Sequence, residues 1–330
     1  MYKEGNGHDI EQSKDSLLSI LSRGEQRAFH ILQLLFELES RKKESYNSII
    51  VLDDIADSFD YLNKYAIIEY LKDLSENSEG KFVFLVLTHN YDFYRTVANR
   101  LSLFQPNLWM VIRNNDGTID IKDGQYKGNV FVNAFVGHDD DDKIFISMIP
   151  YVRNLVEYTK GIDSPEYLKL TECLHQKANT PNIDITAIRD IMASYTLGKA
   201  MKRSASTNKV FDLIMRTADV IISEATPDPI LIQNKIVLSI AIRLLAEKYL
   251  HDKLIASGKS EADLICTGVQ TGNWTQKYKK ACPTDSKRNI IERVNMMTPE
   301  VIHLNSFMYE PLIDLSLNHL ITLYNECKTL

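Results

Sequence analysis

Two short apolar runs, each followed by polar residues, constrain the fold of this chain most strongly. Residues 48–52 (SIIVL) precede Asp53 and Asp54, and residues 82–87 (FVFLVL) precede a Thr-His-Asn tripeptide. Uninterrupted apolar runs of this length are typical of strands buried on both faces of a parallel sheet. A helical pattern over 62–74 separates the two runs, so this part of the chain is predicted to be α/β.

The pattern divides the 330-residue chain into three parts. Residues 1–15 are polar and predict a flexible lead, and 16–137 predict the α/β domain. Residues 138–142 (HDDDD) mark a change of character. We expect a solvated acidic linker there, with a divalent-cation site as the less favoured alternative. From 143 to 330 the periodicity is almost entirely helical, which predicts an all-helical domain.

Further elements of the α/β domain follow from local pattern. A helix is predicted over 25–40, and its expected apolar face contains Phe29, Leu32 and Phe36. Asn-Asp-Gly and Asp-Gly turns separate three shorter predicted strands, over 108–112, 118–121 and 130–136.

Net charge, cysteine content and the length of apolar runs limit the classes of protein to which the chain could belong. The net charge of −6 gives no overall basic signal for nucleic acid, although a local patch could still contact DNA or tRNA. The four cysteines have neither metal-ligand spacing nor the density of a disulfide framework. No apolar run approaches the length of a membrane helix, and the polar N-terminus does not resemble a signal peptide. We therefore expect a reduced, cytoplasmic protein without a membrane partner.

A first candidate site lies at the start of the helix over 25–40. The sequence there is Leu21-Ser22-Arg23-Gly24-Glu25-Gln26. A serine hydroxyl, a glycine that permits close approach and the unpaired N–H groups of a helix N-terminus together favour an anion such as phosphate.

A second candidate site lies where the two predicted strands end. Asp53 is a suitable ligand for Mg²⁺, because hard cations prefer carboxylate oxygen. Asp54 could orient or deprotonate an attacking water. His89 follows the second strand and could donate to a γ-phosphate. The carboxyl ends of parallel strands form the edge at which α/β sheets bind ligands, so these side chains are expected at one rim.

The motifs, in this order, resemble the ABC ATPase family of P-loop NTPases. The likeness is to its SMC-like and recombination-repair-like branch, which includes AAA family ATPases of anti-phage and anticodon-nuclease type. Segment 21–26 resembles the ABC signature, 49–54 the Walker B motif, 57–60 the D-loop, and His89 the switch histidine. The alternative is a coincidental αβαβ fragment, since each motif alone is weak.

The resemblance has specific implications for cofactors and contacts. It implies ATP and Mg²⁺ as cofactors, with Asp53 at the metal and Asp54 and His89 as catalytic groups. Expected nucleotide contacts come from Ser22, Gly24, Glu25, Gln26 and Asp60. The implied fold is the C-terminal half of an ABC-type head, a mainly parallel sheet with flanking helices, followed by the all-helical domain.

The chain departs from the family pattern in two ways. Asp54 stands where the family has glutamate, so water positioning and hydrolysis rate are expected to differ. The Walker A motif is missing, and Gly258-Lys259-Ser260 does not replace it, because no glycine stands five residues earlier. The resemblance then implies that a second copy or a Walker A-bearing partner chain completes the site. The chain could be a split-gene product, a truncation or a degenerate relative.

A third candidate site lies in the helical part. Arg243 and Glu247 are four residues apart and would share a helix face, and His303 follows later. Arginine, glutamate and histidine can together cleave RNA without a metal, and the arrangement loosely resembles the helical domain of anticodon nucleases. The favoured alternative is an intrahelical salt bridge beside an ordinary histidine.

Three functions therefore remain open. The first is an ATP-binding and hydrolysing component of an SMC-like ATPase, acting in bacterial defence or DNA maintenance. The second is a non-hydrolysing regulatory or interaction module derived from such an ATPase. The third is an RNA nuclease in the helical part.

Overall fold

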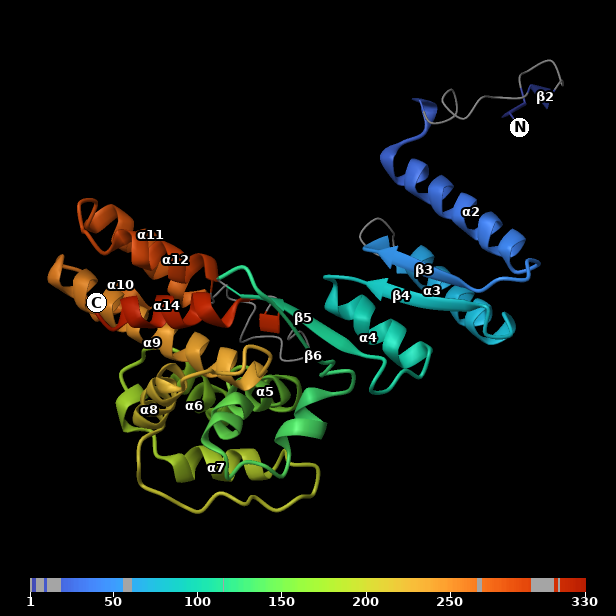
Figure 1. Cartoon of the computed structure of the whole chain (residues 1–330). Coiled ribbons are helices and arrows are strands. Elements are labelled where there is room, and N and C mark those ends of the chain that lie inside the picture. Colours follow the sequence, from blue (N-terminus) through green and yellow to red (C-terminus); the bar gives the residue numbers. More distant parts are fainter. Residues whose placement is uncertain are drawn as a thin grey trace. The chain divides into compact units, whose positions relative to one another are not determined.

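A computed structural model describes most of the chain. The described residues are 2–3, 9–10, 19–55, 61–114, 116–265, 269–297, 312–313 and 315–330. The chain divides into two compact units. The strand unit comprises Met1–Met110 with Lys122–Lys127, and the helical unit comprises Val111–Ile121 with Gly128–Leu330 (Figure 1). Mixed α/β structure with small sheets, followed by a mostly helical second half, agrees with the predicted fold class at this level.

The strand unit is built around one parallel strand pair. Strands β3 (Ser48–Asp53) and β4 (Phe82–Leu87) pair in register, from Ser48 opposite Phe82 to Asp53 opposite Leu87. Helix α3 (Tyr61–Asn77) lies between them in the sequence. The other helices of the unit are α2 (Arg23–Arg41) and α4 (Tyr91–Arg100). A short antiparallel pair, β1 (Tyr2–Lys3) and β2 (Asp9–Ile10), lies within the predicted flexible lead.

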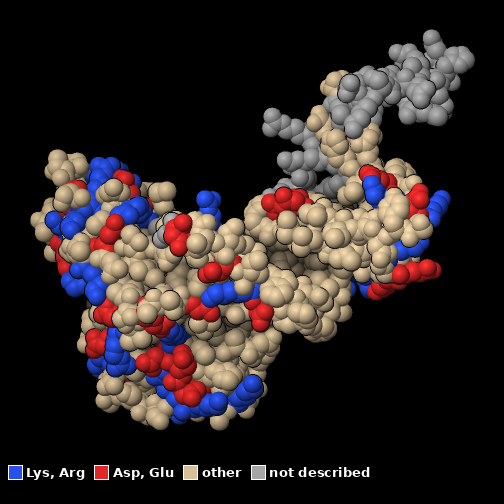
Figure 2. Space-filling model, in the orientation of Figure 1, with Lys and Arg blue, Asp and Glu red and all other residues tan. Residues whose placement is uncertain are grey.

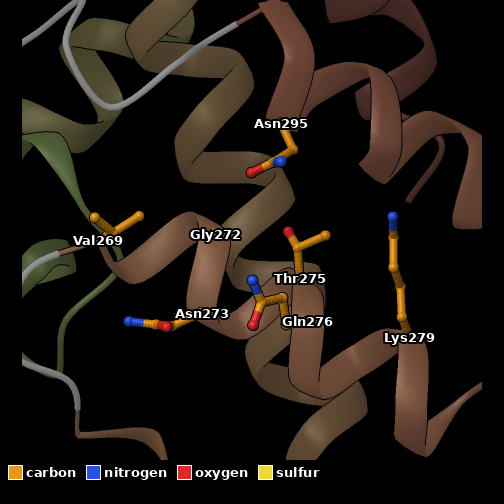
Figure 3. A pocket seen from close by; sticks show the side chains of 7 residues that line it. All are labelled: Val269, Gly272, Asn273, Thr275, Gln276, Lys279 and Asn295. Carbon is orange, nitrogen blue, oxygen red and sulfur yellow. The ribbon is translucent and has the colours of Figure 1, made fainter.

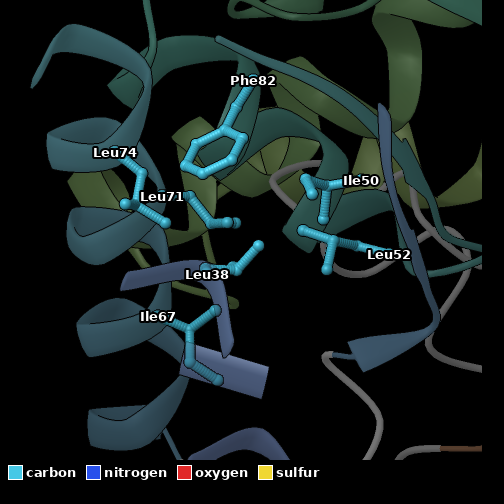
Figure 4. Close-up of a cluster of buried hydrophobic side chains, with 7 residues drawn as sticks. All are labelled: Leu38, Ile50, Leu52, Ile67, Leu71, Leu74 and Phe82. Atoms are coloured by element: carbon cyan, nitrogen blue, oxygen red, sulfur yellow. The ribbon is translucent and has the colours of Figure 1, made fainter. Parts of the chain in front are cut away.

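The prediction that both faces of these strands are buried is wrong. One face packs on α2 and α3, and its core consists of Leu38, Ile50, Leu52, Ile67, Leu71, Leu74 and Phe82 (Figure 4). The other face is exposed: Ile49 is 73% and Val51 57% accessible on β3, and Val83 is 59% accessible on β4. The apolar runs predict strands correctly, but a side chain is buried only where another element covers it.

The apolar face predicted for the helix over 25–40 is also wrong. Leu32 and Phe36 are 51% and 74% exposed. Leu38, 1% exposed, and Leu34 instead pack against the core of the strand unit. Leu34 and Leu38 are four residues apart and share a face, which is the one turned toward the sheet.

Two of the three shorter predicted strands form a hairpin. Strands β5 (Trp109–Arg113) and β6 (Ile119–Asp123) make a two-stranded sheet. The third prediction, a strand over 130–136, is wrong, because that segment forms the π-helix η2 (Phe131–Phe135). Phe131 and Phe135 are both buried, and Phe131 stacks on Tyr151 with ring centroids 3.5 Å apart. A spacing of four residues places both rings on one side in a strand as well as in a helix, so this pair does not distinguish the two in the sequence.

The helical unit is organised around its longest helix. Helix α9 (Ile232–Ala256) is buried along most of its length and contacts six other described helices, whose bounds follow: α5, α6, α8, α11, α12 and α14. The remaining elements are α5 (Asp142–Lys160), α6 (Pro165–Leu174), η3 (Thr180–Asn182), α7 (Ile185–Ala193), α8 (Val210–Ser223), α10 (Glu261–Leu264), α11 (Gln270–Ala281), α12 (Arg288–Met297) and α14 (Leu317–Cys327). Among the described residues, no helix is long and apolar enough to cross a bilayer.

The prediction of a solvated acidic linker at 138–142 is wrong, because aspartates of this segment make structural hydrogen bonds and an ion pair. Asp139 is 1% exposed and accepts hydrogen bonds from the backbone N–H groups of Lys202 and Arg203. Asp141 caps α5, and Asp142 pairs with the Arg203 guanidinium at 2.7 Å. Within the described part of the chain, no cluster of three or more His, Cys, Asp or Glu side chains could hold a metal.

Candidate functional site

The structure brings Asp54 and His89 together at the carboxyl ends of β3 and β4. The backbone N–H of Asp54 donates to the Leu87 carbonyl at 3.0 Å, which extends the parallel pairing past the last strand residue. The Asp54 carboxylate accepts the backbone N–H of His89 at 3.1 Å and lies 2.9 Å from its ring Nδ1. Asp54 and His89, 35 positions apart in sequence, are thus joined by two contacts at one sheet edge.

The Asp54 backbone has an uncommon conformation. Its φ of +45° lies in the left-handed region, which costs energy for residues other than glycine and is often found at functional positions. Hydrogen bonding from the His89 side chain, followed by its backbone N–H, lowers the pKa of the Asp54 carboxyl. The ionised carboxylate therefore fixes the His89 ring through Nδ1, and the His89 side chain is 70% exposed.

Asp53, the last residue of β3, occupies the same uncovered face as Ile49 and Val51, because alternate strand residues share a face. Its carboxylate is exposed and makes no hydrogen bond or ion pair with the described residues. An exposed, uncommitted carboxylate at a strand end can coordinate a hard cation together with phosphate and water oxygens.

The Ser22 segment has a structural role that sequence reasoning missed. Ser22 is the N-cap of α2: its hydroxyl accepts the Glu25 N–H at 3.4 Å, and its own N–H donates to Glu25 Oε2 at 2.8 Å. This reciprocal pair is a capping box, and the pattern Ser-x-x-Glu is its sequence signal. The hydrogen bonds from Ser22 lower the pKa of Glu25. The Gln26 amide donates to the Leu21 carbonyl at 3.0 Å, which tightens the same turn.

Gly24 retains open space around it. A Cβ at this position would meet nothing within 4 Å. Packing inside the chain therefore does not require glycine here, and Ser22 and Gly24 are both exposed. Asp60, in the predicted D-loop segment 57–60, and His303 lie outside the described residues.

Arg243 and Glu247 lie in the interior of the helical unit and not on its surface. Arg243 is 2% and Glu247 0% exposed. Glu247 Oε1 lies 2.9 Å from His175 Nδ1 and accepts the Thr271 hydroxyl at 2.6 Å. Its Oε2 accepts the Gln176 backbone N–H at 2.7 Å and the amide of Gln270 at 2.8 Å.

This network, centred on Glu247, is a cross-link between helices. His175 caps the end of α6, Glu247 lies on α9, and Thr271 lies in the first turn of α11. Burial would raise the pKa of Glu247, but the nearby His175 and Thr271 hold that pKa below its ordinary value. Burial lowers the pKa of His175, to which Arg243 also contributes. The arrangement is a neutral histidine donating to a buried carboxylate, and RNA cleavage by Arg243 and Glu247 stays a prediction from the sequence alone.

The basic residues near the C-terminus are engaged in local contacts. Lys279 and Arg288 both bind Glu292, at 3.0 Å and 3.1 Å. Lys287 donates to the Thr329 hydroxyl at 2.9 Å. Basic and acidic side chains are interspersed across the face of the helical unit seen in Figure 2, and no broad basic patch is present on that face.

The similarity to known proteins is confined to part of the chain. No family model matches the chain, and no solved structure matches it. The chain is 28% identical over 115 residues to a protein of Staphylococcus aureus (strain MRSA252) described as "Uncharacterized chromosomal cassette SCCmec type IVc protein CR006". A Staphylococcus aureus protein with the same description matches equally. The aligned stretch covers 34% of this chain and spans only 16% of the length of each relative.

Proposed function

We propose that the strand unit contributes one side of a composite ATP site, in a component of an SMC-like ABC ATPase. The observation that carries the proposal is the Asp54–His89 pair at the joint end of two parallel strands, with Asp53 exposed beside it. Ligand sites of open α/β sheets form at this edge. The motif order that resembles the ABC signature, Walker B and switch histidine supports the assignment to that family.

The residues at this edge suit a nucleotide phosphate with Mg²⁺. Mg²⁺, when bound, would neutralise charge on the phosphate oxygens, and the exposed Asp53 carboxylate is the group suited to hold it. Asp54 would accept a proton from, or orient, the attacking water. Protonated at both ring nitrogens, His89 would donate Nδ1–H to Asp54 and Nε2–H to the transferred phosphoryl group.

The uncovered sheet face supports the view that the site is completed by another polypeptide segment. Five aliphatic side chains of this face are at least 41% exposed: Ile49, Val51, Val83, Leu85 and Leu87. Within the described residues, β3 and β4 pair only with each other, so their outer edges are free. Covering each aliphatic side chain fully would contribute about 1.5–3 kcal/mol. Parallel sheets are normally covered on both faces, so a second lobe is the expected occupant.

Nucleotide binding with and without a candidate partner tests the proposal. The chain alone should show no tight, Mg²⁺-dependent binding of ATP. Together with a neighbouring gene product that carries Gly-x-x-x-x-Gly-Lys, it should bind and hydrolyse ATP. Asp54→Asn and His89→Ala should reduce hydrolysis by about a hundredfold or more, in the range for loss of a general acid–base group.

Each other result has a defined meaning. Tight binding by the chain alone contradicts the role assigned to a second lobe. Hydrolysis at an unchanged rate in Asp54→Asn contradicts the site. Binding by the pair without turnover would support the non-hydrolysing regulatory function instead.

A further inference from the structure

Two features of the surface differ in the side chains that they expose. A groove of about 460 Å³ between α11 and α12 is lined mainly by polar side chains of the two helices (Figure 3). Its lysine, Lys279, already pairs with Glu292 at 3.0 Å. The hairpin of β5 and β6 instead exposes apolar side chains beside charged groups that have no partner among the described residues.

The apolar side chains of the hairpin alternate with better covered ones. On β5, Trp109 is 51% and Val111 is 65% exposed. On β6, Ile119 is 64% and Ile121 is 65% exposed. In the described part of the chain, β5 and β6 pair only with each other. A two-stranded sheet is marginally stable in water unless its apolar face is packed against something, so this face calls for a partner.

Two backbone hydrogen bonds set the register of the hairpin. The Asn114 N–H donates to the Thr118 carbonyl at 2.9 Å, and the Gly124 N–H donates to the Leu108 carbonyl at 2.8 Å. Directly opposed residues of antiparallel strands share a face. Three cross-strand pairs therefore make up the exposed surface, here called the hairpin face: Trp109 with Asp123, Val111 with Ile121, and Arg113 with Ile119.

The hairpin face carries opposite charges at its two ends. Arg113 lies beside the turn, and Asp123 lies at the other end of the hairpin. Both are exposed, and neither side chain makes a hydrogen bond or an ion pair with a residue that the structure describes. A wholly apolar partner would bury these two charges without compensation, which is costly. The fitting partner has an apolar centre with a negative end and a positive end.

We propose that the hairpin face binds the same face of a second copy of this chain, with the two hairpins reversed end to end. The arrangement has two-fold symmetry, so each contact is made twice. Val111 and Ile121, at the centre, would pack on their counterparts. Arg113 of each copy would lie over the Trp109–Asp123 pair of the other, where it meets an aromatic face and a carboxylate. A second copy thus supplies the apolar centre and both complementary charges.

The size of the hairpin face sets the expected strength of the dimer. Stable interfaces bury about 800 Å² on each partner, more than six side chains of one hairpin provide. The dimer is therefore weak and forms reversibly as the concentration rises. It uses none of the residues of the proposed ATP site, so it requires neither nucleotide nor a second lobe.

Analytical ultracentrifugation of the whole chain without nucleotide tests the proposal, at concentrations from about 1 to about 300 μM. The expected result is a reversible shift from monomer to dimer that stops at the dimer, because a two-fold contact between identical faces is closed. A monomer at every concentration overturns the proposal. Association that continues beyond the dimer also overturns it.

Charge reversal connects the dimer to the hairpin face. Arg113→Asp and Asp123→Arg each bring like charges together across the proposed interface, so each variant should dimerise at least about tenfold more weakly than the wild type. An equimolar mixture of the two variants restores opposite charges at both ends and should associate as the wild type does. Such recovery cannot come from misfolded variants.

A matched control changes a charge on the opposite face of the hairpin. Asp120 follows Ile119 on β6 and accepts the Asn114 carboxamide at 3.0 Å. Asp120→Asn removes this charge and keeps an acceptor, so the variant should dimerise as the wild type does. Unchanged association in Arg113→Asp or Asp123→Arg contradicts the assignment to the hairpin face. Failure of their mixture to recover contradicts the end-to-end arrangement.

Discussion

Two histidine–carboxylate pairs in this protein have the same separation and very different surroundings. His89 and Asp54 lie 2.9 Å apart in the strand unit, with side chains 70% and 41% exposed. His175 and Glu247 also lie 2.9 Å apart in the helical unit, with side chains 10% and 0% exposed. The first pair is open to a ligand and the second is enclosed by hydrogen-bond donors. Burial, and not distance, therefore separates a candidate site from a structural cross-link.

The largest expected effect comes from removing the buried carboxylate. Glu247→Ala leaves four donors without an acceptor and should lower the free energy of unfolding by about 3–5 kcal/mol. Urea-induced unfolding measures this. The matched control is Glu261→Ala, which removes a 76% exposed partner of His251 at 3.0 Å and should cost less than about 1 kcal/mol. Equal costs for the two variants would show that the comparison based on burial fails.

A pH series provides the next largest effect. Burial lowers the pKa of folded His175 below its ordinary 6.5, so the unfolded chain takes up a proton first as pH falls. The stability that this neutral histidine contributes is present above about pH 6.5 and is lost as the pH falls toward the folded-state pKa. The free energy of unfolding measured from pH 8 to 5.5 should therefore decline, and His175→Gln should reduce the slope. An unchanged slope would mean that His175 is not the group responsible.

The exposed pair should respond weakly to the equivalent change. Asp54→Asn removes the charge but keeps an acceptor for the His89 backbone N–H, so unfolding should change by less than about 1 kcal/mol. Denaturation followed by circular dichroism checks this. A loss as large as that in Glu247→Ala would place Asp54 among the structural residues and remove the argument for an open site.

The smallest effect is expected on the uncovered sheet face. Val51 is 57% exposed, so Val51→Ala should change the free energy of unfolding by no more than about 0.5 kcal/mol. Its neighbour Leu52 is 3% exposed on the opposite face, and Leu52→Ala should cost about 2–5 kcal/mol. A large loss in Val51→Ala would show that this face is already covered within the chain.

The sequence predicts the positions of β3 and β4 well, but it predicts poorly which faces of these strands are buried. The runs at 48–52 and 82–87 mark β3 and β4 within one residue, because apolar β-branched and aromatic residues bounded by polar ones suit a strand. The same runs suggested burial on both sides, which only a covering element could have provided. The apolar segment 130–136 predicts a strand but forms η2, because the four-residue spacing of the buried Phe131 and Phe135 fits one face of either a strand or a helix.

The candidate sites show the same difference between local features, which the sequence predicts, and distant contacts, which only the structure reveals. The positions of Asp54 and His89 follow from strand ends, which the sequence marks. The capping box of Ser22 can also be predicted from the sequence, because Ser-x-x-Glu is a local pattern. The partner of Glu247 cannot be predicted from the sequence, because His175 lies 72 residues away and carries no pattern that pairs it with α9.

The sequence by itself determined strands β3 and β4 and the polar residues that end them, because these depend on neighbours within a few positions. Only the tertiary structure decided that Ile49 and Val51 remain exposed and that Glu247 is enclosed. Burial depends on which distant segments cover a residue, and a single sequence carries little information about such contacts.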